Sequence, residues 1–409
     1  MINIDLALKT ILAQINPLRS EITPASSTML GTCIAEDIYA DIASPPFDKS
    51  IVDGFALRIS DLEKNDWELP LGCEIPANSN GPIELPVETT AEIMTGAPIP
   101  FGADAVIAKE QCNHLGMRIQ FQRLTFKKGM NILPMGKEYQ QGELLLKAGT
   151  KITPQRAGIL AACGKTSVMA QPAPRVSIIS TGTELVEANM KPKGGQIRNS
   201  NGPMLVALSG VSGALPKYLG IAGDCKKNLH SLLSEAESSD AIIFCGGVSA
   251  GKYDLIPEIL KESGAKILIH KINLKPGKPF LFAISAKGKP IFGLPGNPCS
   301  VFVCFHLFVV PALAALKGET NIAPKILALP IADSLHHESD RDTCFPAKIF
   351  IDQFQAKVKP GTWFGSADLK GLSECNALLL CKEGVTNHKA GDMIQVLITE
   401  PDFFKLNSL

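Results

Sequence analysis

The sequence lacks the patterns that mark several classes of protein. Its 409 residues hold 40 basic and 40 acidic side chains, so there is no excess charge for general binding to nucleic acid or an anionic membrane. Its 11 cysteines are scattered, mostly within apolar runs, and none forms a CxxC pair. An odd and dispersed set of cysteines fits a reducing cytoplasm better than a disulfide framework. We therefore expect a cytoplasmic protein with neither nucleic-acid nor membrane partners.

The sequence also lacks a hydrophobic run long enough to span a membrane. The most apolar segment, residues 301–316, is shorter than the roughly 20 residues that a spanning helix needs, and it contains Pro311. It predicts a buried core helix. Cys299 and Cys304 are either metal ligands together with His306 or, as we favour, buried apolar side chains. The N-terminal residues show helical spacing of apolar side chains, which is unlike a signal peptide.

A chain of this length predicts two to four domains, at roughly 100–200 residues each. Apolar residues recur with helical spacing in the first 20 residues, and a second helix begins at Pro154. We expect these two helices to pack together in an N-terminal domain made of residues 1–44 and 139–172. Between them, short β-type runs alternate with Pro/Gly-rich turns, which predicts a β-rich inserted domain over residues 45–138.

Residues 173–322 alternate between apolar strands and helices. The predicted strands are 176–180, 217–221, 241–245 and 267–269, followed by a hairpin at 280–292, and the predicted helices are 203–208, 228–237, 255–262 and 301–316. Apolar strands separated by helices imply a mostly parallel sheet covered on both faces. Residues 323–409 return to short strands parted by turns, which predicts a small C-terminal β-barrel or sandwich.

Glycine-rich loops follow two of these strands, at the sheet edge where such folds bind ligands. Their backbone N–H groups and hydroxyls can face an anion. The candidate binding residues are Ser180, Thr181, Gly182, Gly246, Gly247 and Ser249. Glu184 either holds a ligand amine or a divalent ion, or is a solvated side chain beside a helix cap. Asp254 either caps the next helix, as we favour, or faces a magnesium ion.

Three lysines lie close together beside these loops, and they decide the interpretation. Lys271, Lys275 and Lys278 fall within eight residues, and prolines flank the last of them. Surface lysines are usually solvated, but a merely solvated loop does not need this rigidity. Held in a dry cleft, such lysines stabilise a phosphoryl or oxyanion transition state. A nearby turn adds Pro295, Gly296, Asn297 and Pro298.

The N-terminal half carries two further candidates, Asp53 and Thr95, in turns rich in glycine and proline. Turn chemistry alone would explain most of this pattern. Nothing in the sequence pattern alone places these two residues at the glycine-lined crevice.

Six motifs occur in order along the chain. They are PFDKSIVDGFA (46–56), IMTGAP (93–98), STGTEL (180–185), GGVS (246–249), KPGKP (275–279) and LPGNP (294–298). As a set they resemble the MoeA family, the molybdopterin molybdenumtransferases related to the C-terminal domain of gephyrin. The resemblance implies an α/β plus β multi-domain fold. Its parts are a β-rich insertion, a molybdopterin-binding three-layer α/β/α domain and a C-terminal β-barrel-like domain.

The resemblance also implies a homodimer whose cleft is completed by the second subunit's insertion. Asp53 and Thr95 of one chain would then meet Glu184, Asp254 and the lysines of the other. Other implied partners are a molybdopterin adenylyltransferase and molybdoenzyme maturation proteins.

The implied reaction inserts molybdate into adenylated molybdopterin, requires Mg²⁺ and releases AMP. Lysines would neutralise the anions, and the glycine loops would seat phosphate. The acidic residues that would hold magnesium or orient the attacking oxygen are Asp53, Asp224 and Asp254. Asp224 and Ser366 would also contact the substrate.

Some positions depart from the family pattern. Arginines are missing around Leu133 and at Ala347, and Asn199 stands where an aspartate is usual. Lysine cannot copy the bidentate contacts of arginine. Two alternatives therefore stay open beside the leading hypothesis: a weakened or inactive molybdopterin-binding scaffold, and a nucleotide enzyme similar to molybdopterin adenylyltransferase.

Overall fold

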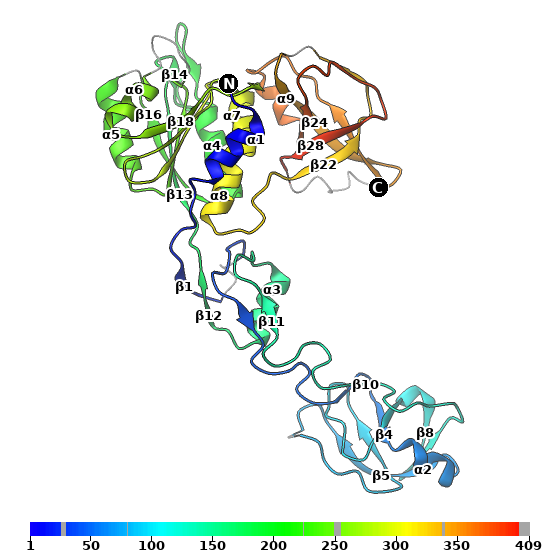
Figure 1. Ribbon diagram of the computed structural model, residues 1–409. Helices are drawn as coiled ribbons and strands as arrows, with labels where there is room; N and C mark the ends of the chain where they lie inside the picture. Colours follow the sequence, from blue (N-terminus) through cyan, green and yellow to red (C-terminus); the bar gives the residue numbers. More distant parts are fainter. Residues whose placement is uncertain (26–29, 80, 224, 249–254, 338–339, 401–409) are drawn as a thin grey trace.

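The computed structural model describes residues 1–25, 30–79, 81–223, 225–248, 255–337 and 340–400. Figure 1 shows an elongated, multi-domain molecule. An α/β body and a C-terminal β unit lie side by side at one end, and a β-rich insertion lies at the other. A narrow stalk of chain segments joins the two ends. The predicted sites Asp224, Ser249 and Asp254 fall outside the described residues.

The α/β body is built on a mixed six-stranded sheet of order β16-β13-β17-β21-β20-β18. The parallel strands are β16 (Leu215–Ile221), β13 (Arg175–Ser180), β17 (Ala241–Cys245) and β21 (Pro290–Leu294). The predicted hairpin is present, because β20 (Leu281–Ile284) pairs antiparallel with β21. β18 (Lys266–His270) pairs antiparallel with β20 and completes the sheet.

Helices cover both faces of this sheet because successive strand side chains point to opposite sides. Ile178 and Ile243 join one apolar cluster, and their neighbours Ile179 and Phe244 join the other. The first cluster takes in α4 (Asn201–Val211), α7 (Pro298–Cys304) and α8 (Val310–Leu316). The second takes in α5 (Lys226–Ala236) and α6 (Ile256–Glu262). Strands buried on both faces explain the fully apolar sequence of β17.

The segment Pro298–Leu316 forms one continuous helix with a π-helical turn at Phe305–Val309. Pro311 follows closely and has no N–H to donate to the carbonyl of Leu307, which accounts for the local rearrangement. Among the described residues, this helix is the one long and apolar enough to cross a membrane, but 89% of it is buried inside the protein. The prediction of a buried core helix is confirmed. Cys299 and Cys304 are buried within it.

The N-terminal helix α1 (Ile4–Leu12) packs in a different place from the one predicted. Its buried residues Ala7 and Ile11 belong to the cluster that contains α8. The second helix, α3 (Pro154–Ala162), places Leu160 in a separate small cluster of the stalk. The expected packing of α3 on α1 is therefore wrong. α1 offers a strongly amphipathic face that the apolar helix α8 can cover, whereas α3 buries a single residue.

The stalk and the insertion are held by short antiparallel pairs and one larger sheet. In the stalk, β1 (Glu21–Pro24) pairs with β12 (Ser167–Ala170), and β2 (Ile38–Tyr39) pairs with β11 (Leu144–Leu146). β3 (Lys49–Ser50) pairs with β10 (Ile132–Leu133) at the entrance to the insertion. The insertion sheet has the order β7-β4-β6-β5-β9-β8. Its elements are β4 (Gly54–Leu57), α2 (Ile59–Lys64), β5 (Glu68–Ile75), β6 (Thr90–Ile93), β7 (Ala105–Ala108), β8 (Cys112–Leu115) and β9 (Arg118–Phe121).

The C-terminal unit is a curled sheet of order β19-β24-β26-β28-β22, with β25 on the outer side of β24. Its elements are β22 (Ile326–Pro330), β23 (Leu335–His336), β24 (Asp342–Asp352), β25 (Gln355–Pro360), α9 (Leu369–Ser373), β26 (Ala377–Cys381), β27 (Asn387–His388) and β28 (Met393–Ile398). Ile331, just after β22, bridges to Val358 in β25, which curls the sheet toward closure. The first strand, β19 (Leu274–Lys275), comes from the α/β body.

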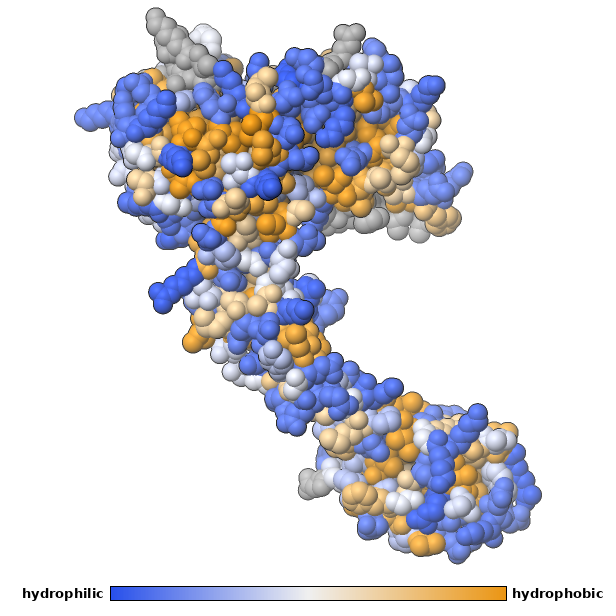
Figure 2. Space-filling model, viewed as in Figure 1, coloured by the Kyte–Doolittle hydropathy of each residue, from blue (hydrophilic) through white to orange (hydrophobic). Residues whose placement is uncertain are grey.

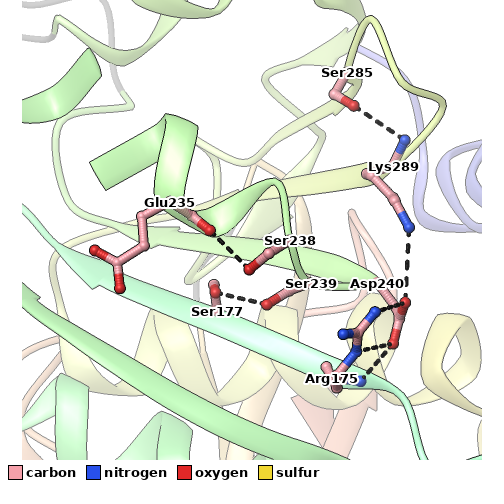
Figure 3. A network of polar contacts seen from close by, with 8 residues as sticks. All are labelled: Arg175, Ser177, Glu235, Ser238, Ser239, Asp240, Ser285 and Lys289. Carbon is pink, nitrogen blue, oxygen red and sulfur yellow. Dashed lines mark hydrogen bonds and ion pairs between the residues drawn. The ribbon is translucent and has the colours of Figure 1, made fainter. Parts of the chain in front are cut away.

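A polar network fixes the amino ends of the central strands (Figure 3). Arg175, at the start of β13, donates from its backbone N–H and its guanidinium to the Asp240 carboxylate, at 2.9 and 3.2 Å. Lys289 approaches the same carboxylate at 3.7 Å. Burial alone would raise the pKa of Asp240, but the hydrogen bonds and charge of Arg175 hold that pKa below its usual range.

We expect Asp240→Asn to lower the free energy of unfolding at pH 7 by about 1–2 kcal/mol, because the variant loses the charged acceptor for Arg175. The loss is no larger because the Arg175 side chain is 60% exposed, so that solvent screens the ion pair. A carboxyl group with a lowered folded pKa stabilises the fold above its unfolded pKa of about 3.9. This stability is lost as pH falls through the folded pKa, so the two proteins should converge only at pH values below that lowered pKa. Urea unfolding at several pH values checks this. Asp352→Asn, at a surface pair with Lys357, is the control and should change stability by less than about 0.5 kcal/mol. Equal losses in both variants would contradict the account.

Candidate functional site

The carboxyl ends of β13, β17 and β21 meet at one edge of the sheet, and the loops that follow them are hydrogen-bonded together. The Thr181 N–H donates to the Cys245 carbonyl at 2.8 Å, and the Gly246 N–H donates to the Leu294 carbonyl at 3.0 Å. Gly246 has φ +92°, and a methyl group there would collide with the Thr181 carbonyl oxygen. Glycine is therefore required where these loops cross.

The turn after β21 lies against the same glycine. The Cβ position of Gly296 is 4.0 Å from the Gly246 Cα atom. Asn201, at the start of α4, donates its side-chain N–H to the Gly296 carbonyl at 2.6 Å. Sequence reasoning missed Asn201. The available signal was its position: Asn201 lies just before the predicted helix 203–208, where an asparagine side chain can bond to a neighbouring loop.

The turn after β21 borders a cleft of about 410 Å³ between the α/β body and the C-terminal unit, whereas Thr181 and Gly246 do not line it. Its lining residues are Lys275, Pro276, Gly277, Lys278, Pro279, Pro295, Gly296, Asn297, Ser300, Arg341, Trp363, Gly365 and Ser366. Lys275 and Lys278 lie beside the turn at Gly296, whereas Gly246 and Glu184, which we expected at the same crevice, are not among the lining residues. The Asn297 side chain donates to the Ser366 hydroxyl at 2.8 Å, which joins the two walls. Pro298 follows as the first residue of α7.

The pairing of β19 with β24 places the lysine loop against the C-terminal unit. Leu274 pairs with Asp342, and Lys275 pairs with Thr343. Arg341 directly precedes Asp342, the first paired residue of β24. Its guanidinium approaches the Leu274 carbonyl at 3.5 Å and the Asp340 carboxylate at 3.0 Å. The cleft therefore gathers three cationic side chains from two domains. Arg341 was missed because no motif marks it.

The arginine that the family pattern places near Phe345 would not reach this cleft from Ala347. Ala347 is fully buried in the core of the C-terminal unit. Arg341 instead presents a guanidinium at the cleft wall. The departure at Ala347 therefore does not leave the cleft without arginine.

Asn199, the departure from aspartate, makes contacts that need an amide. Its side-chain N–H₂ donates to the Ser180 hydroxyl at 2.9 Å and to the Tyr218 hydroxyl at 2.7 Å, and its oxygen accepts from the Gly202 N–H at 3.0 Å. Burial is the main cause that raises the pKa of Tyr218 to about 12. A carboxylate at this position could still accept from the Ser180 hydroxyl, but it could not donate to Tyr218, whose own proton goes to Glu187 at 3.0 Å. Asn199 thus fastens the segment before α4 to the end of β13 at Ser180 and to β16 at Tyr218.

Several predicted residues do not line the cleft. Ser180 and Thr181 are buried, and the exposed Glu184 carboxylate lies close to Gly182. β14 (Leu185–Val186) and β15 (Ile197–Arg198) form a small parallel pair just beyond that loop. Lys271 directly follows β18, has φ +75° and is not among the cleft residues. Gly247, with φ +63°, packs on the Thr181 hydroxyl.

Asp53 and Thr95 meet each other in the insertion. The Asp53 carboxylate accepts from the Thr95 hydroxyl at 2.7 Å and from the Thr95 N–H at 2.8 Å, and Lys109 lies 3.7 Å away. The hydroxyl bond is the main cause that lowers the pKa of Asp53. Figure 1 places this sheet, labelled by β4, at the opposite end of the molecule from the α/β body. Within one chain the pair does not reach the cleft.

Two family models match this chain. The model of the MoeA N-terminal region, domains I and II, matches residues 2–164, and that of a probable molybdopterin-binding domain matches residues 177–315. Together they cover the stalk, the insertion and the α/β body.

Among curated relatives, a molybdopterin molybdenumtransferase from Staphylococcus aureus is 35% identical over 389 residues, covering 93% of this chain and 92% of its own length. One from Staphylococcus epidermidis is 33% identical over 381 residues, covering 92% of this chain and 90% of its own. A crystal structure of a molybdopterin biosynthesis MoeA protein from Pyrococcus horikoshii matches with a TM-score of 0.82 and 29% identity, covering 97% of this chain and 100% of that one. The chain therefore belongs to the MoeA family of molybdopterin molybdenumtransferases.

Proposed function

We propose that this protein inserts molybdenum into molybdopterin, taking adenylated molybdopterin and molybdate and releasing AMP. The observation that carries the proposal is the cleft in which Lys275, Lys278 and Arg341 gather beside the turn at Gly296. Both substrates are anions, and the pyrophosphate link of the first is a polyanion. Three cations in a chain without net charge form a local site for such ligands.

The cleft residues divide between binding and charge stabilisation. Arg341 can hold an oxyanion through two N–H groups, whereas each lysine acts as a compact charge on a stiffened loop. Asn297 and Ser366 supply neutral hydrogen-bonding groups from opposite walls. As the pyrophosphate link breaks, negative charge builds on the departing AMP phosphate, and fixed cations lower the barrier without reorganising. The main chain at Gly296 lets the ligand approach closely.

A homodimer is part of the proposal. Asp53 and Thr95 are bonded to each other but lie far from their own chain's cleft. A second copy would bring its insertion to that cleft. Figure 2 shows apolar areas on the α/β body and on the C-terminal unit, where Figure 1 places α1 and α8 in the former and β22 in the latter. The exposed apolar side chains of these elements are Leu6, Ile326 and Leu327, and they suit a contact between copies.

A Mg²⁺ requirement is the finer part of the proposal. No carboxylate lies among the described residues that line the cleft. Asp53 fits one magnesium contact, because it is partly exposed, its pKa is lowered, and Thr95 bonds only one of its oxygens, although a metal would have to replace Lys109 at the other, 3.7 Å away. Mg²⁺ is often held by one or two carboxylates plus substrate phosphates. Asp53 would hold the ion, which would supply charge neutralisation at the phosphates.

We also propose two partners. A molybdopterin adenylyltransferase would deliver the substrate, and maturation proteins of molybdoenzymes would receive the product. A cytoplasmic location suits 11 free cysteines. The alternative of an adenylyltransferase-like enzyme is disfavoured by the matches, which span 93% of the chain and include the insertion. The scaffold alternative rests on the missing arginines around Leu133, in β10 of the insertion.

The activity itself is the first test. Purified protein with adenylated molybdopterin, molybdate and Mg²⁺ should release AMP, measured by chromatography. Saturating substrate that binds tightly but yields no AMP would select the scaffold alternative and reject the proposed function.

Removing a cleft cation tests the charge argument. We expect Lys278→Met to lower kcat/KM for AMP release by about 100-fold, because the variant loses a positive charge that stabilises the transition-state anion. The control is Lys359→Met. Lys359 is an exposed lysine on β25 that pairs with Asp333. That variant should retain kcat/KM within about twofold. Similar losses of kcat/KM in both variants would show that the positive charge in the cleft contributes no more to AMP release than a surface charge does.

Mixing two inactive variants tests the shared cleft. Asp53→Asn alters the insertion, and Lys278→Met alters the cleft. If each cleft uses the insertion of the other subunit, a refolded equal mixture should recover about a quarter of the wild-type activity, because half of the dimers hold one intact site. Each variant alone should stay inactive. A mixture no more active than its parts, with mixed dimers demonstrated by mass spectrometry, would contradict the arrangement.

A further inference from the structure

Two histidines and a cysteine of the C-terminal unit, none of which lines the cleft, converge. One ring nitrogen of His337, one of His388 and the sulfur of Cys381 lie within 4.8 Å of one another. Cys381 ends β26 and is buried, and the histidines are half-buried. The two imidazole rings are nearly parallel, with an interplanar angle of 7° and centroids 6.0 Å apart.

The histidines lack the partners that buried imidazoles normally have. Among the residues that the structure describes, neither ring nitrogen of His337 has a hydrogen-bond partner, and neither does the buried Nε2 of His388. Buried polar groups without partners cost free energy, so each such group needs an explanation. A ligand that accepts lone pairs from these nitrogens would supply one.

The backbone fixes the three side chains in place. Leu335 pairs with His388 and His336 with Asn387, so β23 and β27 form a two-stranded ribbon. The His337 N–H then donates to the Thr386 carbonyl at 2.9 Å. Little movement is needed to bind a metal, since ligand atoms in a tetrahedral zinc site lie about 3.3–3.6 Å apart.

A metal at this cluster would meet two imidazoles and one thiol whose proton it has to displace. Lys275 is close enough to act on His337 electrostatically. Burial raises the pKa of Cys381 to about 12, so a metal must displace its proton. The resulting thiolate offsets the repulsion between the metal and Lys275.

We infer that His337, Cys381 and His388 form a zinc-binding site, with a fourth position left for water. Two imidazoles and a thiolate are ligands that Zn²⁺ favours. The ion would fasten the β23–β27 ribbon to the end of β26. It would also steady the cleft, because Cys381 pairs with Thr343, which in turn pairs with Lys275. This site is independent of the proposed molybdenum chemistry.

Zinc titration of the full-length, tag-free protein against a chromophoric chelator tests the site. Wild-type protein should bind one equivalent. Cys381→Ala and His388→Asn should bind at least about tenfold more weakly, since even changing a residue behind a ligand costs 10–100-fold in affinity. The matched controls should bind like wild type. Cys344→Ala removes a buried cysteine of the neighbouring strand, and His336→Asn removes an exposed histidine bonded to Asn387.

Cobalt(II) gives a second readout that requires the sulfur ligand. Co²⁺ should produce near-ultraviolet thiolate charge-transfer absorption in wild type and in Cys344→Ala, and none in Cys381→Ala. Circular dichroism establishes that each variant is folded, and His388→Asn provides a second ligand change on the ribbon if Cys381→Ala does not fold. Wild-type protein that binds no zinc, or a folded ligand variant that binds it as tightly as wild type, would overturn the inference.

Discussion

The close approach of three parallel strand ends is the constraint on which the site depends. β13, β17 and β21 run in the same direction, so the loops that follow them must leave from one edge. The Gly246 backbone fits against the Thr181 carbonyl only because it has no Cβ atom. Main-chain groups rather than side chains therefore form the floor of this edge, as in sites that receive phosphate.

The second constraint is the seam between the α/β body and the C-terminal unit. β19 leaves the body and pairs with β24, which sets Lys275 beside Thr343 and brings Arg341 to the cleft. The contact between Asn297 and Ser366 closes the opposite side. Charge for an anionic substrate is thus assembled from two domains, and neither domain alone holds all three cations. The candidate zinc site lies on the same strand ladder and would stiffen it.

The sequence could predict the elements of the α/β body because its strands are buried on both faces. Runs such as Ala241–Cys245 contain only apolar residues and are separated by clear helices. The lysine loop and the turn at Gly296 were also predictable, since glycine and proline mark backbone requirements that act locally. These are short-range properties that a single sequence expresses.

Contacts between distant segments could not be predicted in the same way. The packing of α1 on α8 depends on which apolar surface is left uncovered, and periodicity does not record this. Arg341 reaches the cleft only through the β19–β24 register, and the amide of Asn199 is explained only by its neighbours Ser180 and Tyr218. The grouping of His337 with Cys381 likewise requires the ribbon to fold first.

The most direct test of the central claim is the position of molybdenum in a crystal of the protein soaked with molybdate and AMP. Diffraction measured across the molybdenum absorption edge locates the metal without ambiguity. The account predicts an anomalous peak in the cleft, between the lysine loop and Arg341. A peak elsewhere, or an empty cleft at saturating molybdate, would contradict the assignment of the cleft as the anion site.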